Sequence, residues 1–306
     1  MEVEKGVGMI ISASYRTDIP AFYGEWFLNR VKAGYCKVLN PYSARAGEVS
    51  LRREDVDGFV FWTKNVVPFL GCLEEVHRMG YPFVVQHTVT GYPRVLEAAV
   101  LEAERAVAAM RLLAERYGKR VCVWRYDPVV WSAVTPERWH LEQFEKLAKA
   151  LEGVVDEVVV SWVQGYAKTR RRMGEVDELG WQELATEEKR RLIGVLAGMA
   201  QERGIRLTLC TQPDLVGEGC EAARCVDAGR MGDVAGRDIR VRLKGNREGC
   251  GCYESRDIGE YDTCPHGCVY CYAVRSQALA KGRYRHHDPL GAVSYTHLTL
   301  PTILLV

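Results

Sequence analysis

The stretch from Glu157 to Trp162 reads E-V-V-V-S-W, three valines in a row that end on a serine and a tryptophan. An unbroken run of β-branched residues is typical of a strand that is buried on both faces. After a polar loop comes a long helical segment from Thr186, where T-E-E-K supplies an N-cap and early acidic residues. A buried strand followed by a helix is one unit of a parallel sheet.

The same unit recurs along the chain. We expect strands at 9–13, 36–39, 58–62, 82–86, 121–125, 157–162 and 205–210, and helices at 22–33, 67–79, 95–117, 136–151 and 186–203. Right-handed crossovers through seven or eight such units close a barrel, so the predicted fold is an α/β, TIM-like (β/α) barrel. An open doubly wound sheet is the alternative. Because G-x-G-x-x-G does not follow the first strand, its dinucleotide-binding form is not favoured.

Composition narrows the class of protein. The chain has 306 residues, 47% hydrophobic and 26% charged, with a formal net charge of +1. That balance gives no general attraction to nucleic acid or to an anionic membrane, and the basic run K-T-R-R-R at 168–172 is typical of a solvated helix face. No apolar run approaches the ~18 residues that a membrane span needs, and the first residues do not form a secretory leader. We therefore expect a cytoplasmic protein.

The chain changes character after about residue 216, where glycine, arginine and cysteine become frequent. We divide it into a barrel at 1–216, a segment at 217–292 that completes the barrel and carries a cysteine cluster, and a tail at 293–306. In the segment at 217–292 we expect a last strand at 238–243 and a short helix at 272–281. The tail resembles the translation of a DNA-library adapter, so its His297 is set aside and we expect the natural chain to continue differently.

Polar residues gather where the expected strands end. In a parallel barrel these carboxyl ends share one mouth, where ligands bind. The candidate catalytic residues at this mouth are Arg16, Lys64, His87, Arg125 and Asp127. Each could be a cap or a turn residue, but three cations together favour a small-molecule substrate that carries a carboxylate or phosphate. His87 is the candidate acid or base.

Four of the eleven cysteines, Cys36, Cys72, Cys122 and Cys210, lie in apolar or strand-like surroundings and are expected to be buried, inert thiols. Five others crowd into one polar, glycine-rich region near the end of the chain. Cys264, Cys268 and Cys271 have C-x-x-x-C-x-x-C spacing, while Cys250 and Cys252 form a C-G-C pair. Clustering away from any core pattern favours metal binding over packing. Three thiolates on a [4Fe–4S] cluster leave one iron without a protein ligand, where a small chelating molecule can bind.

The stretch T-C-P-H-G-C-V-Y-C-Y, residues 263–272, resembles the radical S-adenosylmethionine superfamily, and in particular its spore photoproduct lyase branch. The resemblance implies that Cys264, Cys268 and Cys271 hold a [4Fe–4S] cluster whose open iron binds S-adenosylmethionine. It implies that Tyr270 lies near the adenine and that an electron donor reduces the cluster. In that superfamily the motif follows the first barrel strand, whereas here it follows the expected barrel.

The chain as a whole resembles an uncharacterised prokaryotic family, a domain of unknown function, over about residues 9–288. The resemblance rests on S-Y-R-T-D-I-P near the start, on W-T-K-N, and on C-G-C followed by T-C-x-H-G-C-V-Y-C-Y-A. It implies a barrel with a C-terminal cysteine-rich iron–sulfur module, and it brings no established reaction.

The sequence therefore predicts a metal-binding, iron–sulfur protein, a radical S-adenosylmethionine-like enzyme of unknown substrate. Two alternatives remain open. In the first, the protein binds the iron–sulfur cluster but carries out no radical reaction, and it serves as an electron carrier or redox sensor. The other is a zinc-stabilised binding protein whose ion is held by Cys250, Cys252, Cys268 and Cys271. Cys250 and Cys252 could also ligate the first cluster, or form a second metal site with Cys220 or Cys225.

Overall fold

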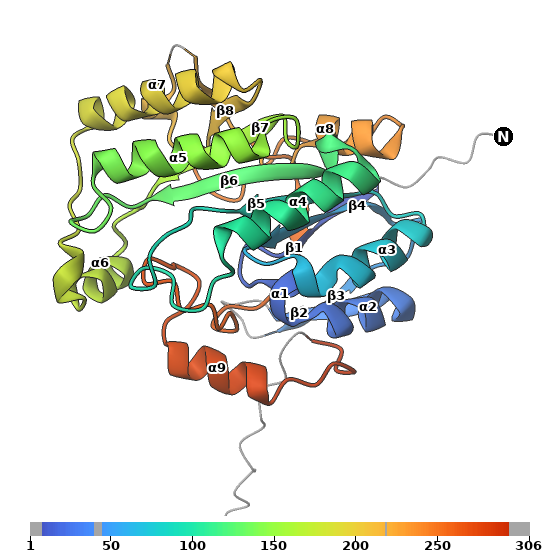
Figure 1. Ribbon diagram of the computed structural model, residues 1–306. Coiled ribbons are helices and arrows are strands. Elements are labelled where there is room, and N and C mark those ends of the chain that lie inside the picture. Colours follow the sequence, from blue (N-terminus) through green and yellow to red (C-terminus); the bar gives the residue numbers. More distant parts are fainter. Residues whose placement is uncertain (1–7, 40–44, 218, 294–306) are drawn as a thin grey trace, which may run out of the picture.

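The computed structural model describes residues 8–39, 45–217 and 219–293. Its centre is one eight-stranded sheet in the order β10-β1-β4-β5-β6-β7-β8-β9, and neighbouring strands run parallel throughout (Figure 1). The strands are β1 (Met9–Ala13), β4 (Val56–Thr63), β5 (Phe83–Thr88), β6 (Cys122–Val129), β7 (Glu157–Trp162), β8 (Arg206–Leu209), β9 (Glu221–Ala222) and β10 (Ser255–Asp257). The predicted α/β class and the parallel sheet are confirmed.

Helices connect these strands. They are α1 (Ile19–Phe22), α2 (Gly24–Ala33), α3 (Leu70–Arg78), α4 (Ala103–Tyr117), α5 (Glu137–Leu151), α6 (Ala167–Gly174), α7 (Thr186–Glu202), α8 (Ala228–Ala235) and α9 (Gln277–Arg285). Short 3₁₀ helices lie at Val67–Phe69, Lys119–Val121, Asp177–Leu179 and Pro213–Leu215. Among the described residues, none of these helices combines the length and the apolar character that a bilayer crossing requires.

The pairing of the described strands does not close the sheet. Within the described ranges, β10 and β9 are the two edges of the sheet, each paired with one neighbour. The chain passes from one edge to the other through residues 223–254, so the C-terminal part supplies an edge strand beside β1. The structure thus shows an eight-stranded, parallel α/β sheet, and the pairing of its described strands does not show a closed barrel.

Period-two alternation gives the sheet two different faces. Ile11, Phe59, Phe61, Val85 and Trp124 belong to a large core against helices α2, α3, α4, α5 and α7, the helix-covered face (Figure 1). The alternate residues Ile10, Val60, Val84, Val123 and Val159 pack against residues 223–252, including helix α8, and this is the segment-covered face. Burial on both faces explains the continuous valine runs.

Helix α8 approaches the segment-covered face closely. Gly58 in β4 makes this approach possible, because a Cβ there would stand only 2.4 Å from the sulfur of Met231. Met231 is fully buried in the same small core as Val60 and Val84. The residues after β9 therefore act as a covering layer for the sheet.

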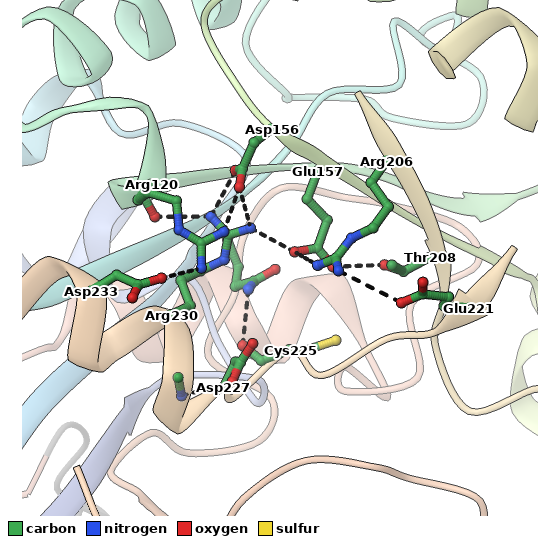
Figure 2. Close-up of polar contacts among 12 residues, drawn as sticks. Arg120, Asp156, Glu157, Arg206, Thr208, Glu221, Cys225, Asp227, Arg230 and Asp233 are labelled. Carbon is green, nitrogen blue, oxygen red and sulfur yellow. Dashed lines mark hydrogen bonds and ion pairs between the residues drawn. The ribbon is translucent and has the colours of Figure 1, made fainter. Parts of the chain in front are cut away.

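A buried ion-pair network joins helix α8 to the amino ends of strands β7 and β8 (Figure 2). Arg230 of α8 is 2% exposed and bonds both Asp156, at 2.9 Å, and Glu157, at 2.6 Å. Arg120 pairs with Asp156, and Arg206 pairs with Glu157 at 3.3 Å. Because removing one member would leave buried charges unpaired, this network ties α8 to the amino ends of the strands.

Several sequence expectations are wrong in detail. The strand expected at 36–39 lies in β2 (Tyr35–Leu39), which pairs antiparallel with β3 (Ala46–Ser50) outside the main sheet. The last strand of the sheet is β10, whereas residues 238–243 form only an isolated bridge at Leu243. The long helix begins at Ala103 rather than 95, and the C-terminal helix covers 277–285. Apart from Val293, the adapter-like tail lies outside the described residues.

Candidate functional site

The carboxyl ends of the strands bring polar side chains to one edge of the sheet. On the segment-covered face the apolar row gives way, toward these ends, to Ser12, Trp62, Gln86, Arg125, Ser161 and Cys210. The predicted gathering of strand-end residues is therefore a consequence of parallel pairing and of the two-residue repeat. Two groups of cysteines lie at this edge of the sheet.

The first group, which we call the loop group, consists of Cys264, Cys268 and Cys271. Their loop is fixed to the segment that follows β5, since Cys268 forms an antiparallel bridge with Glu97 and the Val269 N–H donates to the Leu96 carbonyl at 3.1 Å. Gly267 makes the turn with φ of 80°, a conformation that favours glycine. The C-terminal loop thus reaches the edge of the sheet that holds Lys64.

The three thiols of the loop group interact electrostatically. Burial raises the pKa of Cys264 well above its usual range, and Asp18, Cys271 and Cys268 raise it further. Burial also raises the pKa of Cys268, while the nearby Lys64 ammonium lowers it. The N–H of Ala273 donates to the Cys271 sulfur at 3.4 Å. As free thiols Cys264 and Cys268 are protonated, and a bound cation would be needed to hold them as thiolates.

Lys64 is tied to the loop group through Glu97. Its ammonium donates to Glu97 at 2.7 Å and stands 5.6 Å above the ring of Tyr270. The carboxylate of Glu97 is buried and also accepts from Tyr270 and, at 3.0 Å, from Thr90. Burial lowers the pKa of Lys64, but Glu97 and Cys268 outweigh it, so the net shift is upward. Lys64 is therefore a charged partner of the loop, and Tyr270 has its hydroxyl committed to Glu97.

Asp18 holds the other side of the loop group. Its carboxylate caps α1 at the Ala21 N–H, accepts the Lys64 backbone N–H at 2.8 Å, and lies 2.8 Å from Nε2 of His266. Neither Asp18 nor His266 was singled out in the sequence as a candidate. His266 lies inside the T-C-P-H-G-C motif, so this contact fixes the cysteine loop to the end of β1.

His87 lies on the helix-covered face. It occupies every second position of β5 together with Phe83 and Val85, so the three side chains share that face. It is fully buried, and neither ring nitrogen has a hydrogen-bond partner among the described residues. Burial lowers its pKa to about 4, although the Asp18 carboxylate acts in the opposite direction. The structure therefore makes His87 a neutral, buried side chain, away from the face that carries Arg125.

Arg16 lies at the edge formed by β1 and β10. Its guanidinium is stacked between Tyr15 and Tyr261, with its Nε 3.7 Å from Asp257. Asp257 is a buried carboxylate that accepts from the Ser12 and Ser14 hydroxyls at 2.8 and 2.7 Å. Burial raises the pKa of Asp257, and these donors oppose the shift. No sequence signal identified Asp257, because it lies in a three-residue polar strand.

Arg125 and Asp127 do lie together, as the sequence predicted. The guanidinium of Arg125 bonds Asp127 through both Nε and an Nη, and Ser161 donates to the same carboxylate. Burial would raise the pKa of Asp127, but Arg125 and Ser161 outweigh it and the net shift is downward. Arg125 also stacks 5.1 Å from the ring of Trp62. Electrostatic contact with Lys64 links this pair to the loop group.

The second group of cysteines, which we call the four-thiol group, consists of Cys210, Cys225, Cys250 and Cys252. The sulfurs of Cys210 and Cys225 are 3.6 Å apart, Cys225 contacts Cys252, and Cys252 contacts Cys250. Cys210 was expected to be an inert core thiol, and the structure instead places it in this group. Cys220, also considered from the sequence, bonds the Glu221 carbonyl instead.

The contacts among these four thiols give them different acidities. A hydrogen bond from Cys252 lowers the pKa of Cys250 to about 6. A hydrogen bond with Cys225 lowers the pKa of Cys252, but the contact with Cys250 and burial outweigh it and raise the value to about 11. Cys250 is also only partly buried, whereas Cys252 is 3% exposed. Cys250 is therefore the accessible, more acidic member.

The two groups are separate sets of side chains. The four-cysteine zinc site considered from the sequence needs Cys250 and Cys252 beside Cys268 and Cys271, but Cys250 and Cys252 instead contact Cys225 and Cys210. Across residues 8–39, 45–217 and 219–293, no three Cys, His, Asp or Glu side chains form a group that could hold one metal ion. In this structure the zinc set is thus not assembled.

Comparison with known proteins identifies the family. No curated protein matches the chain significantly. A solved structure described as a candidate alpha-L-fucosidase from Bacteroides thetaiotaomicron is 9% identical over 93% of this chain and 97% of that one, with a TM-score of 0.29, too low to support any shared property. A family model described as "Domain of unknown function (DUF1848)" matches residues 10–273, which agrees with the family resemblance of the sequence. The chain therefore belongs to the DUF1848 family.

Proposed function

We propose that this protein is an iron–sulfur protein in which Cys264, Cys268 and Cys271 hold a [4Fe–4S] cluster at the carboxyl ends of the strands. The observation that carries the proposal is the loop group itself. Three thiols from one short loop lie within electrostatic reach of one another, next to the buried Lys64 and beside no competing disulfide. The finer proposal, a radical S-adenosylmethionine-like enzyme of unknown substrate in a barrel-like fold, rests on this cluster.

The residues present fit such a cluster. Each cysteine of a [4Fe–4S] cluster binds a different iron, so the sulfurs need not surround one point as they must around zinc. Backbone N–H donation to a ligand sulfur is a common second contact of such clusters, and the Ala273 N–H already has that position on Cys271. The positive charge of Lys64 would offset part of the negative charge that three thiolates bring to a buried site.

The chain's own residues would position and insulate this site. When bound, a cluster with three cysteine ligands supplies one-electron reduction at an iron that S-adenosylmethionine could reach. Arg172 of α6 donates to the Cys271 carbonyl, and His266 with Asp18 fixes the first half of the loop. Glu97 holds both Lys64 and Tyr270, which keeps the ammonium beside Cys268. Arg16 remains the candidate contact for an anionic substrate, since among the described carboxylates it pairs with Asp257 alone, at 3.7 Å.

The proposed compartment and partners follow from the same chemistry. All eleven cysteines are free thiols, which suits the reducing cytoplasm. Reduction of a cluster requires an electron donor, and we propose a small-molecule substrate rather than nucleic acid. The run at 168–172 supports this, because Arg170, Arg171 and Arg172 are engaged within the chain.

Electron paramagnetic resonance tests the proposal in two steps. The full chain is reconstituted anaerobically with iron and sulfide, reduced, and measured with and without S-adenosylmethionine. We expect a reduced-cluster signal that changes shape when S-adenosylmethionine is added, together with formation of 5′-deoxyadenosine. A cluster signal that does not change when S-adenosylmethionine is added would contradict the radical enzyme and support an electron carrier or redox sensor. A protein that takes up zinc and no iron would overturn the iron–sulfur proposal.

A further inference from the structure

The four-thiol group is built from three separate parts of the chain. Cys210 follows β8, Cys225 lies between β9 and α8, and Cys250 and Cys252 come from the loop before β10. None of these positions is needed for the loop group. Cys225 and Cys252 are buried, whereas Cys210 and Cys250 are partly buried, so the group extends from the protein interior toward its surface. All four also belong to the small apolar core of the segment-covered face.

The sulfurs form a continuous series of contacts. Cys250 contacts Cys252, Cys252 contacts Cys225, and Cys225 lies 3.6 Å from Cys210. Thiol–disulfide exchange needs one sulfur to approach another, so each neighbouring pair in the series is placed for exchange. No three of these or other described Cys, His, Asp and Glu side chains are arranged around one metal ion.

Two arginines and a glutamine hold the group in place. An Nη of Arg125 donates to the Cys225 sulfur at 3.0 Å, and Gln86 donates to the Cys225 carbonyl at 2.9 Å. Arg247 bonds Thr211 and interacts with Cys210. A hydrogen bond with Cys210 and the Arg125 guanidinium lower the pKa of Cys225, but contact with Cys252 and burial outweigh them and raise it to about 12. The pKa of Cys210 is raised as well, so both side chains are thiols in the reduced protein until exchange reaches them.

We propose that the four-thiol group is a two-electron thiol–disulfide redox site, in which Cys250 reacts with a small-molecule disulfide and the oxidation ends as a Cys210–Cys225 disulfide. The Cys250 sulfur bonds one sulfur of the small disulfide, breaks its S–S bond and releases one thiolate. Cys252 then bonds the Cys250 sulfur and releases the second thiolate. This leaves a Cys250–Cys252 disulfide at the accessible end of the series.

Two further exchanges transfer the disulfide from the Cys250–Cys252 pair to the Cys210–Cys225 pair. Cys225 bonds Cys252 and frees Cys250, and Cys210 then bonds Cys225 and frees Cys252. The two electrons come from Cys210 and Cys225, and their two thiol protons go to the two released small-molecule thiolates. Cys250 and Cys252 are regenerated as thiols, so the balance is one protein disulfide formed for one small disulfide reduced.

Disulfide mapping by mass spectrometry tests this proposal on the full chain. Reduced protein is treated with oxidised glutathione, quenched in acid and alkylated. We expect loss of two alkylatable thiols, a Cys210–Cys225 linkage, and full reversal by dithiothreitol. Cys210→Ser should instead stop the oxidation at a linkage that includes Cys252, and Cys250→Ser should slow the reaction at least tenfold.

Cys72→Ser is the matched control, because Cys72 is partly buried and lies outside both groups. It should oxidise like the wild type, and circular dichroism spectra should show that each variant is folded. Equal oxidation of Cys72 and the four-thiol group in the wild type would overturn the proposal. So would four thiols that resist oxidation because one tightly bound zinc ion per chain protects them.

Discussion

The loop group and the four-thiol group lie along the same edge of the sheet, but they are built differently. The loop group comes from eight consecutive positions, Cys264 to Cys271, whose spacing is visible in the sequence. The four-thiol group spans Cys210 to Cys252 and exists only because parallel pairing and the covering segment bring three loops together. Spacing identifies a local ligand set, whereas a dispersed set is found only once the fold is known.

The surroundings of the two groups also differ. Lys64 and Glu97 form a buried ion pair beside the loop group, whose thiols interact through charge. In the four-thiol group the sulfurs of Cys210 and Cys225 are 3.6 Å apart, and Arg125 donates directly to the sulfur of Cys225. Sulfurs that would repel one another as thiolates suit a cluster whose irons supply positive charge, while thiols in contact suit exchange between sulfurs. On this basis we propose metal binding for the loop group and thiol redox chemistry for the four-thiol group.

The largest expected effect separates the two groups by iron content. Cys268→Ser should abolish iron uptake, because two cysteines do not retain a [4Fe–4S] cluster. Cys225→Ser should keep the wild-type iron content and lose the thiol oxidation. Iron and acid-labile sulfide are measured on both variants after the same anaerobic reconstitution. If both variants lose iron equally, the division between the groups is wrong.

The next effect concerns the cation beside the four-thiol group. Arg125→Met leaves the partly buried Asp127 carboxylate with Ser161 and without its guanidinium partner, so we expect a loss of about 3 kcal/mol in the free energy of unfolding. Urea denaturation measures it. The double variant with Asp127→Asn should recover part of this loss, since no buried charge is left unpaired. A double variant less stable than Arg125→Met would contradict the assignment.

Acid should destabilise the protein through its buried histidines. His87 has a pKa of about 4 in the folded protein, below its ordinary value near 6.5, so the unfolded chain binds the proton first. The stabilising contribution is complete above pH ~6.5 and is lost as pH falls through about 4, a loss of about 3 kcal/mol.

Urea denaturation between pH ~7 and ~4 checks this prediction about His87, because the loss develops between the two pKa values. His87→Gln should remove about half of the acid-dependent loss, because His140 is also buried and has a similar pKa of about 4. His140 differs in having Tyr126 and the Val130 carbonyl as partners of its ring nitrogens. An unchanged pH dependence in His87→Gln would show that His87 is not the neutral, buried group described above.

The smallest expected effect concerns Tyr270. Tyr270→Phe removes one hydroxyl that donates to Glu97, while Lys64 and Thr90 continue to satisfy that carboxylate. We expect a loss of about 1 kcal/mol in the free energy of unfolding and an unchanged iron content. A loss of iron in this variant would mean that Tyr270 positions the cluster loop directly.

The sequence predicted the parts of the fold that depend on local pattern. The valine run of β7 and the M-I-I-S-A run of β1 are strands with the predicted bounds. The three-residue polar strand β10 carries no such pattern, because its place beside β1 is fixed by the Asp257 contacts with Ser12 and Ser14. Residues 36–39 alternate buried and exposed positions, which suits the outer hairpin where they are found.

The candidate site was predictable to a similar extent. Arg125, Asp127 and Lys64 were found because they end strongly apolar strands. Glu97 and Asp18 were missed, since their importance comes from contacts with the distant Tyr270 and His266. Cys210 looked like an ordinary core thiol because its partner Cys225 is fifteen positions away. Each miss is a long-range contact that no local pattern encodes.

The most direct test of the central claim is the metal content of the full chain purified without oxygen. The account predicts about four iron and four sulfide atoms per chain, held by the loop group. Both should remain after the four-thiol group has been oxidised and reduced again. A chain that contains zinc instead of iron, or that takes up no iron on reconstitution, would contradict it.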